Sequence, residues 1–247
     1  MPTLNIQPVE YSGKKLNDLG ERIISEFYPL IDGFIINREI TLKELVEEDR
    51  RKDLYGRRIL EETSIFPPYS VALVDSGFFY FLSKYDTPIL SITSLPIINS
   101  AHPTDDISKL ITIVIPEGLT DTETQKLIEE KLEENIEEGL TTPKLTKYSY
   151  FDGFGLDKVA FVSTYRTEFW NIDSEEHIER CAIIGVHEMG HAFGILEHHL
   201  EYNKQTSNGK FCAMTTGLLG KIPWEQHISL IAPSFCVDCY KKLGVYK

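Results

Sequence analysis

Residues 174–194 read SEEHIERCAIIGVHEMGHAFG, and no other stretch of the chain says as much about its architecture. Apolar residues recur in it at the spacing of one helical face, which predicts an α-helix of about 20 residues. Asp173 or Ser174 can cap the first turn, and the two glutamates that follow favour the positive end of the helix dipole. Gly194 marks the predicted end, because glycine adopts a left-handed backbone conformation at little cost.

The motif HEMGH occupies 187–191, near the end of this predicted helix. Residues four apart lie one turn apart on the same face, so His187 and His191 can offer their imidazoles to one zinc ion. Glu188 lies about 100° around the helix from His187, near such an ion without having to bind it. This placement suits a general base for a water molecule that zinc makes more acidic. The alternative is two histidines in a helical core, because so short a pattern also recurs by chance.

Three features after the motif favour the metal site over that alternative. Gly194 follows at a spacing that lets the chain turn back toward the two histidines. Glu197, His198 and His199 come next, and all three side chains are of types that bind zinc. Met214, in the segment CAMTTG, could form a turn beneath the site.

A second set of metal-binding residue types overlaps the first. Cys236 and Cys239 form a CxxC motif, whose thiolates can chelate one zinc ion from a tight turn. With Cys212 and one of His198 or His199 they make a Cys₃His set, which is typical of a closed structural site. The alternative for a CxxC motif is a redox pair or two buried thiols. The sequence thus predicts two zinc ions per chain, one catalytic and one structural.

These motifs resemble those of the archaemetzincins, a family of metzincin-class zinc metallopeptidases, over residues 151–243. The family signature HExxHxxGxxHC is followed by CxM and then by CxxC, and the chain keeps that order. The resemblance implies zinc-dependent hydrolysis of peptide bonds and a metzincin-like α/β (α+β) fold. That fold has a mixed sheet, an active-site helix and a C-terminal zinc-knuckle subdomain. The resemblance also implies that 151–170, with Ser163 and Arg166, carries an edge strand along which a peptide substrate could lie.

The chain departs from the family pattern just after the predicted helix. In strict register the third histidine position of the family holds Glu197, and a histidine stands in place of the first knuckle cysteine. One extra residue after Gly194 would instead align His198 with the third catalytic ligand and His199 with that cysteine. We predict this second register, because a loop absorbs an insertion that a helix cannot. Glu197 as the third ligand, with His198 in the knuckle, is the alternative.

Outside these motifs the chain mixes predicted strands and helices, as in an α/β or α+β domain. We expect a single metzincin-like domain over 1–247, with an N-terminal α/β part to about residue 194 and a C-terminal subdomain over 195–247. Thr41 and Glu44 form a capping box, which indicates the start of a short charged helix. Further expected helices span 14–28 and 121–138, and expected strands span 71–74, 78–82, 89–93, 110–115 and 159–165.

Composition limits the partners of the chain. Its 247 residues carry a formal net charge of −13, which disfavours nonspecific binding to nucleic acid and to anionic membranes. No apolar run reaches the ~18 residues of a membrane span, and the N-terminal segment MPTLNIQPVEYSGKK lacks the layout of a secretory signal. We therefore expect a cytoplasmic protein. The resemblance to archaemetzincins implies a peptide or protein substrate, and we expect the chain to act as a monomer. Among the remaining residues, we expect Cys181 in the core, His102 and His177 at the surface, and structural roles for Tyr165, Tyr202 and His227.

A zinc-stabilised binding module that has lost catalysis is the rival prediction. It would keep the fold and both metal sites, but its altered ligands would no longer support hydrolysis. The presence of Glu188 favours the enzyme, because a purely structural site has no use for a base at that position.

Overall fold

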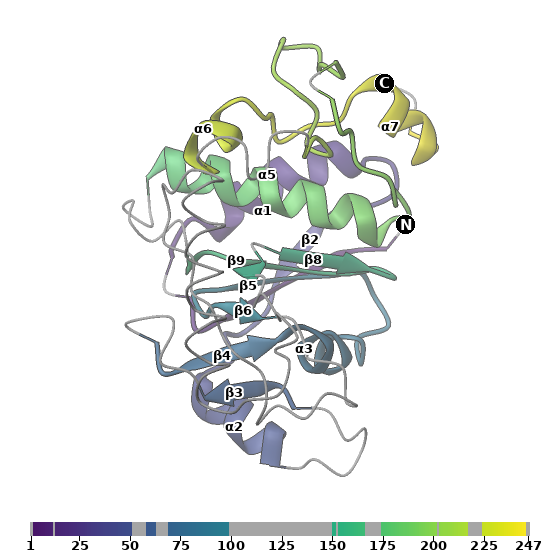
Figure 1. The fold of residues 1–247 in the computed structure, drawn as a ribbon. Helices are drawn as coiled ribbons and strands as arrows, with labels where there is room; N and C mark the ends of the chain where they lie inside the picture. The colour runs from purple at the N-terminus through teal and green to yellow at the C-terminus, as the bar shows by residue number, and fades with distance from the viewer. Residues whose placement is uncertain are drawn as a thin grey trace, which may run out of the picture.

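A computed structural model gives the arrangement of the chain (Figure 1). The predicted strand at 110–115 and the predicted helix at 121–138 lie outside the residues that it describes, as do His102, Arg166 and Tyr202. The described residues are 2–11, 13–50, 58–62, 69–98, 150–151, 153–165, 174–201, 203–216 and 224–245.

The larger of two sheets has five strands in the order β2-β1-β5-β9-β8. Four of them run parallel: β2 (Phe34–Ile36), β1 (Leu4–Val9), β5 (Ile89–Thr93) and β9 (Val159–Ser163). The fifth, β8 (Gly153–Leu156), is antiparallel to β9 and forms one edge of the sheet. Every residue of β5 and β9 is buried, as expected for central strands that are covered on both faces.

Two helices, α1 (Leu16–Phe27) and α5 (Glu175–Ala192), cover one face of this sheet (Figure 1). Their apolar faces meet in the main core, and Arg22 links them by ion pairs to Glu179 at 2.8 Å and to Glu175 at 2.6 Å. The helix α5 is the one predicted from its capping and stop signals. The Ser174 side chain accepts a hydrogen bond from the backbone N–H of His177, and the chain leaves the helix at Gly194 with a φ of 100°.

The opposite face carries a second, smaller layer (Figure 1). The helix α3 (Asp75–Leu82) packs there, with the ring of Phe78 edge-on to that of Phe161 at 5.2 Å. A four-stranded sheet in the order β3-β4-β6-β7 lies beside it, in which β4 and β6 are parallel. Its strands are β3 (Leu60–Glu62), β4 (Val71–Val74), β6 (Ile97–Ile98) and β7 (Tyr150–Phe151).

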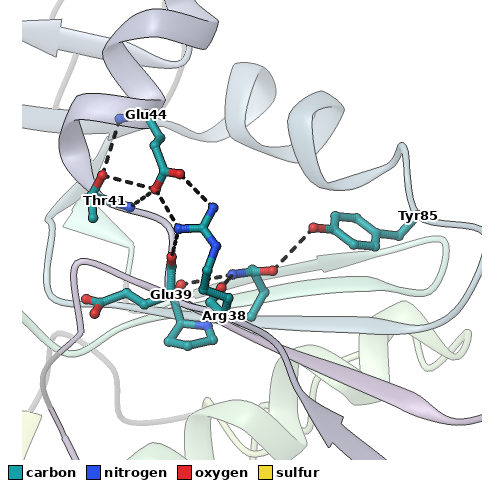
Figure 2. A network of polar contacts seen from close by, with 7 residues as sticks. Arg38, Glu39, Thr41, Glu44 and Tyr85 are labelled. Atoms are coloured by element: carbon teal, nitrogen blue, oxygen red, sulfur yellow. Dashed lines mark hydrogen bonds and ion pairs between the residues drawn. The ribbon is translucent and has the colours of Figure 1, made fainter.

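The predicted capping box opens α2 (Leu42–Arg50), as Figure 2 shows. Glu44 accepts hydrogen bonds from the backbone N–H of Thr41 at 2.9 Å and from its hydroxyl at 3.0 Å, while Arg38 donates to the same carboxylate at 2.6 Å. The hydrogen bond from Arg38, followed by those from Thr41, lowers the pKa of Glu44 to about 2. The ion pair with Arg38 therefore stabilises the start of α2 together with the capping box.

Several predictions of single elements can be compared with the structure. The strands expected at 71–74 and 89–93 are confirmed, whereas the strand expected at 78–82 is wrong, because those residues belong to α3. A short apolar run fits a buried strand and a buried helix equally well. The surface position predicted for His177 is also wrong, since this residue is fully buried and its ring nitrogen lies 3.2 Å from the hydroxyl of Tyr11.

The C-terminal segments lie on the side of α5 that faces away from the sheet (Figure 1). They include α6 (Trp224–Ser229) and α7 (Val237–Lys242), together with the described residues 195–201 and 203–216, which form an irregular stretch. Isolated bridges join this stretch to itself and to Ile231, which gives it a fixed path despite the lack of regular strands. Among the described residues, no helix combines the length and the apolar character needed to cross a membrane.

Candidate metal centres

Three imidazoles converge at the end of α5. The Nε2 atoms of His187 and His191 are 3.1 Å apart, those of His191 and His198 are 2.9 Å apart, and those of His187 and His198 are 3.2 Å apart. Three nitrogens that bind one zinc ion tetrahedrally lie roughly 3.3 Å from one another. The observed spacing is slightly shorter and fits a single ion between the three rings.

Backbone carbonyls set the orientation of two of these rings. Nδ1 of His187 lies 2.8 Å from the carbonyl oxygen of Ala213, and Nδ1 of His191 lies 2.6 Å from that of Ile195. A carbonyl only accepts hydrogen bonds, so each Nδ1 carries the proton and each Nε2 presents a lone pair. Lone pairs that face one another cannot form hydrogen bonds, whereas a cation placed between them binds both.

The same imidazoles are held in the neutral form that binds metals. Burial lowers the pKa of His187 from 6.5 to about 3, and the nearby His191, His198 and His227 lower it further, while the hydrogen bond to Ala213 opposes the shift. Burial also lowers the pKa values of His191 and His198. These lowered pKa values reduce the competition between protons and a metal ion for the ring nitrogens near neutral pH.

Glu188 and Met214 complete the surroundings of this cluster. Glu188 is 9% exposed, and its side chain lies against the edge strand β8, where Gly153 leaves room for it. Met214 is fully buried beneath the helix, so close that a Cβ at Gly190 would lie 2.9 Å from its sulfur atom. The methionine thus packs under the turn that separates the two helical ligands.

A second cluster joins one imidazole to three thiols. Nε2 of His199 lies 3.2 Å from Sγ of Cys239 and 3.4 Å from Sγ of Cys236, and Sγ of Cys212 lies 3.7 Å from that of Cys239. Around a tetrahedral zinc ion two sulfurs lie roughly 3.8 Å apart, and a nitrogen lies roughly 3.6 Å from a sulfur. All four ligand atoms lie within 4.8 Å of one another, so this set also fits one ion.

Hydrogen bonds and burial shift the pKa values of the three thiols in different directions. The hydrogen bond with Cys239 lowers the pKa of Cys212 to about 6, and backbone N–H groups, including that of Cys236 at 3.2 Å, contribute to this shift. Burial raises the pKa of Cys236, and the hydrogen bond between Cys239 and Cys212, together with burial, raises that of Cys239. A divalent cation would offset this cost and allow all three to bind as thiolates.

The two alignments considered for the third ligand assign different roles to Glu197, His198 and His199, and the structure gives the position of each. His198 lies in the first cluster and His199 lies in the second. Glu197 faces away from both, with its carboxylate 2.5 Å from Nζ of Lys242 on α7 and its side chain 80% exposed. Lys242 also lowers the pKa of Glu197, so this carboxylate is already satisfied by a cation of the protein.

Some residues around the clusters were not predicted from the sequence. The carbonyls of Ala213 and Ile195 have no sequence signature, because every residue offers the same acceptor. Gly153 and Gly155 do have one, since glycine inside a strand often marks a close approach of two backbones. His227 is buried near His187, close enough for its charge to affect the pKa of that ring.

Comparison with known proteins bears on the fold. No family model matches the sequence, and no curated protein matches it. The crystal structure of archaemetzincin from Methanopyrus kandleri has a TM-score of 0.52 at 15% identity, and the match covers 98% of this chain and 94% of that chain. For archaemetzincin from Archaeoglobus fulgidus complexed with malonate, the TM-score is 0.47 at 15% identity, with 97% of this chain and 99% of that chain covered. The likeness to the first structure confirms the predicted fold class and the predicted resemblance to archaemetzincins at the level of the fold.

Proposed function

We propose that this chain is a zinc-dependent peptidase, with His187, His191 and His198 as the ligands of the catalytic ion and Glu188 as the general base. The convergence of three neutral imidazoles on one point, with Nε2 atoms no more than 3.2 Å apart, carries the proposal. Three protein ligands leave the fourth position of a tetrahedral zinc shell open, which is the pattern of catalytic rather than structural sites.

The proposed chemistry divides between the ion and one side chain. Bound zinc lowers the pKa of a coordinated water toward ~7 and polarises a carbonyl group. Glu188 follows His187 directly in α5 and is buried against β8. In this position it takes the proton from the attacking water and later delivers it to the leaving amine. The carbonyls of Ala213 and Ile195 hold His187 and His191 in the tautomer that binds the ion.

The edge of the larger sheet offers a place for the substrate backbone. Within the part of the chain that the structure describes, β8 pairs only with β9, so its outer edge faces no other strand. An extended peptide can add itself to such an edge through backbone hydrogen bonds. Since β8 packs directly on α5 beside Glu188, a peptide bound there would pass close to the proposed base.

The second cluster has the composition of a structural site. His199, Cys212, Cys236 and Cys239 provide four protein ligands, which leaves no position for water on a tetrahedral zinc ion. We propose that this second ion fastens the C-terminal segment to the stretch that follows α5. Its three thiols stay available to zinc in a reducing compartment, which favours a cytoplasmic location.

Cleavage of a peptide library by the zinc-loaded protein, followed by mass spectrometry of the products, tests the proposal. Glu188→Gln keeps nearly the same shape, so zinc content should be unchanged while hydrolysis falls by at least ~10²-fold. Equal rates for the two proteins would exclude Glu188 as the base. Peptide binding without cleavage by either protein, with both clusters loaded, would instead support the binding module.

A further inference from the structure

The edge strand β8 has glycine at alternate positions, and both glycines meet the same helical residue. Residues two apart in a strand face the same side of the sheet, which for Gly153 and Gly155 is the side of α5. A Cβ at Gly155 would lie 1.8 Å from the carbonyl oxygen of Glu188. A Cβ at Gly153 would lie 2.6 Å from Cγ of Glu188 and 3.0 Å from its Oε1. The strand therefore contributes no side chain between itself and the helix at this point.

The strand has little freedom to move away from Glu188. On its other face Phe154 packs against Phe79, with ring centroids 5.8 Å apart, and against Phe161 at 5.4 Å. The turn that joins β8 to β9 is tied to α5, because the backbone N–H of Lys158 donates to the carbonyl of Ala192 at 2.9 Å. Aromatic packing and this hydrogen bond hold β8 against the helix.

We propose that Gly153 and Gly155 are positioning residues for Glu188. Gly155 sets the gap between the strand and the helix backbone, and Gly153 leaves the space that the Glu188 side chain occupies. The effect of this contact on catalysis rests on the proposed function, whereas the contact itself does not. A peptide paired with β8 would lie about 4.8 Å from that strand, so one short strand would both align the substrate and confine the base.

Side chains added at the two glycines would collide with different atoms, so the two positions can be tested separately. At Gly155 the added carbon would meet backbone, so a substitution there displaces the strand and threatens folding. At Gly153 the nearest atom belongs to the Glu188 side chain, although the carbonyl oxygen of Phe161 also lies 2.7 Å away. Gly153→Ala is therefore the informative change. Gly33→Ala is the matched control, because a Cβ at Gly33 would meet nothing within 4 Å.

A thermal double-mutant cycle tests the contact without any reference to catalysis. Gly153→Ala should lower the melting temperature of the parent and of Glu188→Gln, which has the same shape as glutamate. In Glu188→Ala, which lacks the crowded atoms, the same change should lower it by less than half as much. If Gly153→Ala folds only when residue 188 is alanine, that outcome would support the proposal in the same way as the smaller shift. Equal shifts in all three backgrounds, or failure to fold in all three, would overturn the proposal.

Kinetics then tests the consequence for the base. Misplacement of a catalytic group by about 1 Å can cost ~10²-fold in rate, so Gly153→Ala should lose 10-fold or more in kcat at unchanged zinc content. KM should change by less than about 2-fold, because the outer edge of β8 is untouched, and Gly33→Ala should behave as the parent. A loss confined to KM would overturn the positioning role. If the parent cleaves no peptide, the proposed function fails, while the thermal cycle still decides the contact.

Discussion

A single step along the chain separates two candidate ligands, one from each cluster. His198 and His199 are neighbours, and successive side chains of an extended segment point to opposite sides. The backbone N–H of His199 donates to the carbonyl of Met214 at 2.8 Å, and its own carbonyl accepts from Thr216 at 3.0 Å. These two bonds fix the segment so that one imidazole faces α5 and the next faces the thiols.

The proposed third ligand of the histidine cluster can be tested with a pair of variants. We expect His198→Ala to lose both the zinc of the histidine cluster and hydrolysis, because no other His or Glu side chain of the described segment 195–199 belongs to that cluster. Glu197→Ala should keep both, since it removes only an exposed ion pair with Lys242. Zinc content by native mass spectrometry and peptide cleavage report the outcome. The reverse pattern would make Glu197 the ligand.

At the scale of helices and strands, the sequence was informative where a local signal was strong. The start of α5 at Ser174, its stop at Gly194 and the capping box of α2 are all local, and all three are as predicted. Neither β1 nor β8 was among the individual strands predicted from the sequence. β8 reads GFGL and so lacks the β-branched residues that mark strands, whereas β1 depends on pairing with β5, more than 80 residues away.

The same distinction applies to the candidate centres. Ligand types and helical spacing could be read from the chain, because residues four apart on a helix must share a face. The choice between Glu197 and His198 could not be made with the same force, since a loop has no fixed period. It depends on Lys242 and Met214, which lie far along the chain and come close only in the folded protein.

The capping box gives α2 a pH-dependent contribution to stability. The pKa of Glu44 is about 2 in the folded protein, below its ordinary value of 4.5. A lowered pKa of this kind stabilises the fold above pH 4.5, and the contribution disappears as the pH falls from 4.5 toward 2. We therefore expect Glu44→Gln to lower the melting temperature at pH 7 and to match the parent more closely as the pH falls. Glu21→Gln, on the exposed side of α1, is the charge-matched control, and an equal effect of both variants at pH 7 would contradict this role.

At the scale of the whole molecule, one short segment serves both clusters. Cys212 belongs to the second cluster, the carbonyl of Ala213 orients His187, and Met214 packs under α5 while its carbonyl holds His199. The backbone N–H of Ala213 also donates to the carbonyl of Ser234, just before the CxxC motif. The residues of this segment lie in the main core together with those of α1 and α5. The two clusters are therefore joined by packing and hydrogen bonds rather than only by sequence.

This connection predicts that damage to the second cluster weakens the first. Cys239→Ser should lower the melting temperature, because binding of a structural zinc ion contributes to folding. It should also weaken zinc binding at the three histidines by ~10-fold or more, the scale of losing a group that orients a ligand. Competition with a chromophoric chelator measures the affinity, and Cys181→Ser, in the core but outside both clusters, is the control. Unchanged affinity at the histidines would mean that the two clusters are independent.

Anomalous scattering at the zinc edge, from crystals of protein purified without a metal-affinity tag and supplied with zinc, tests the central claim most directly. The structure predicts one peak between the Nε2 atoms of His187, His191 and His198, and a second between His199 and the three thiols. Glu188 should lie beside the first peak without binding it. A peak at the thiols with none at the three histidines would contradict the proposed catalytic site.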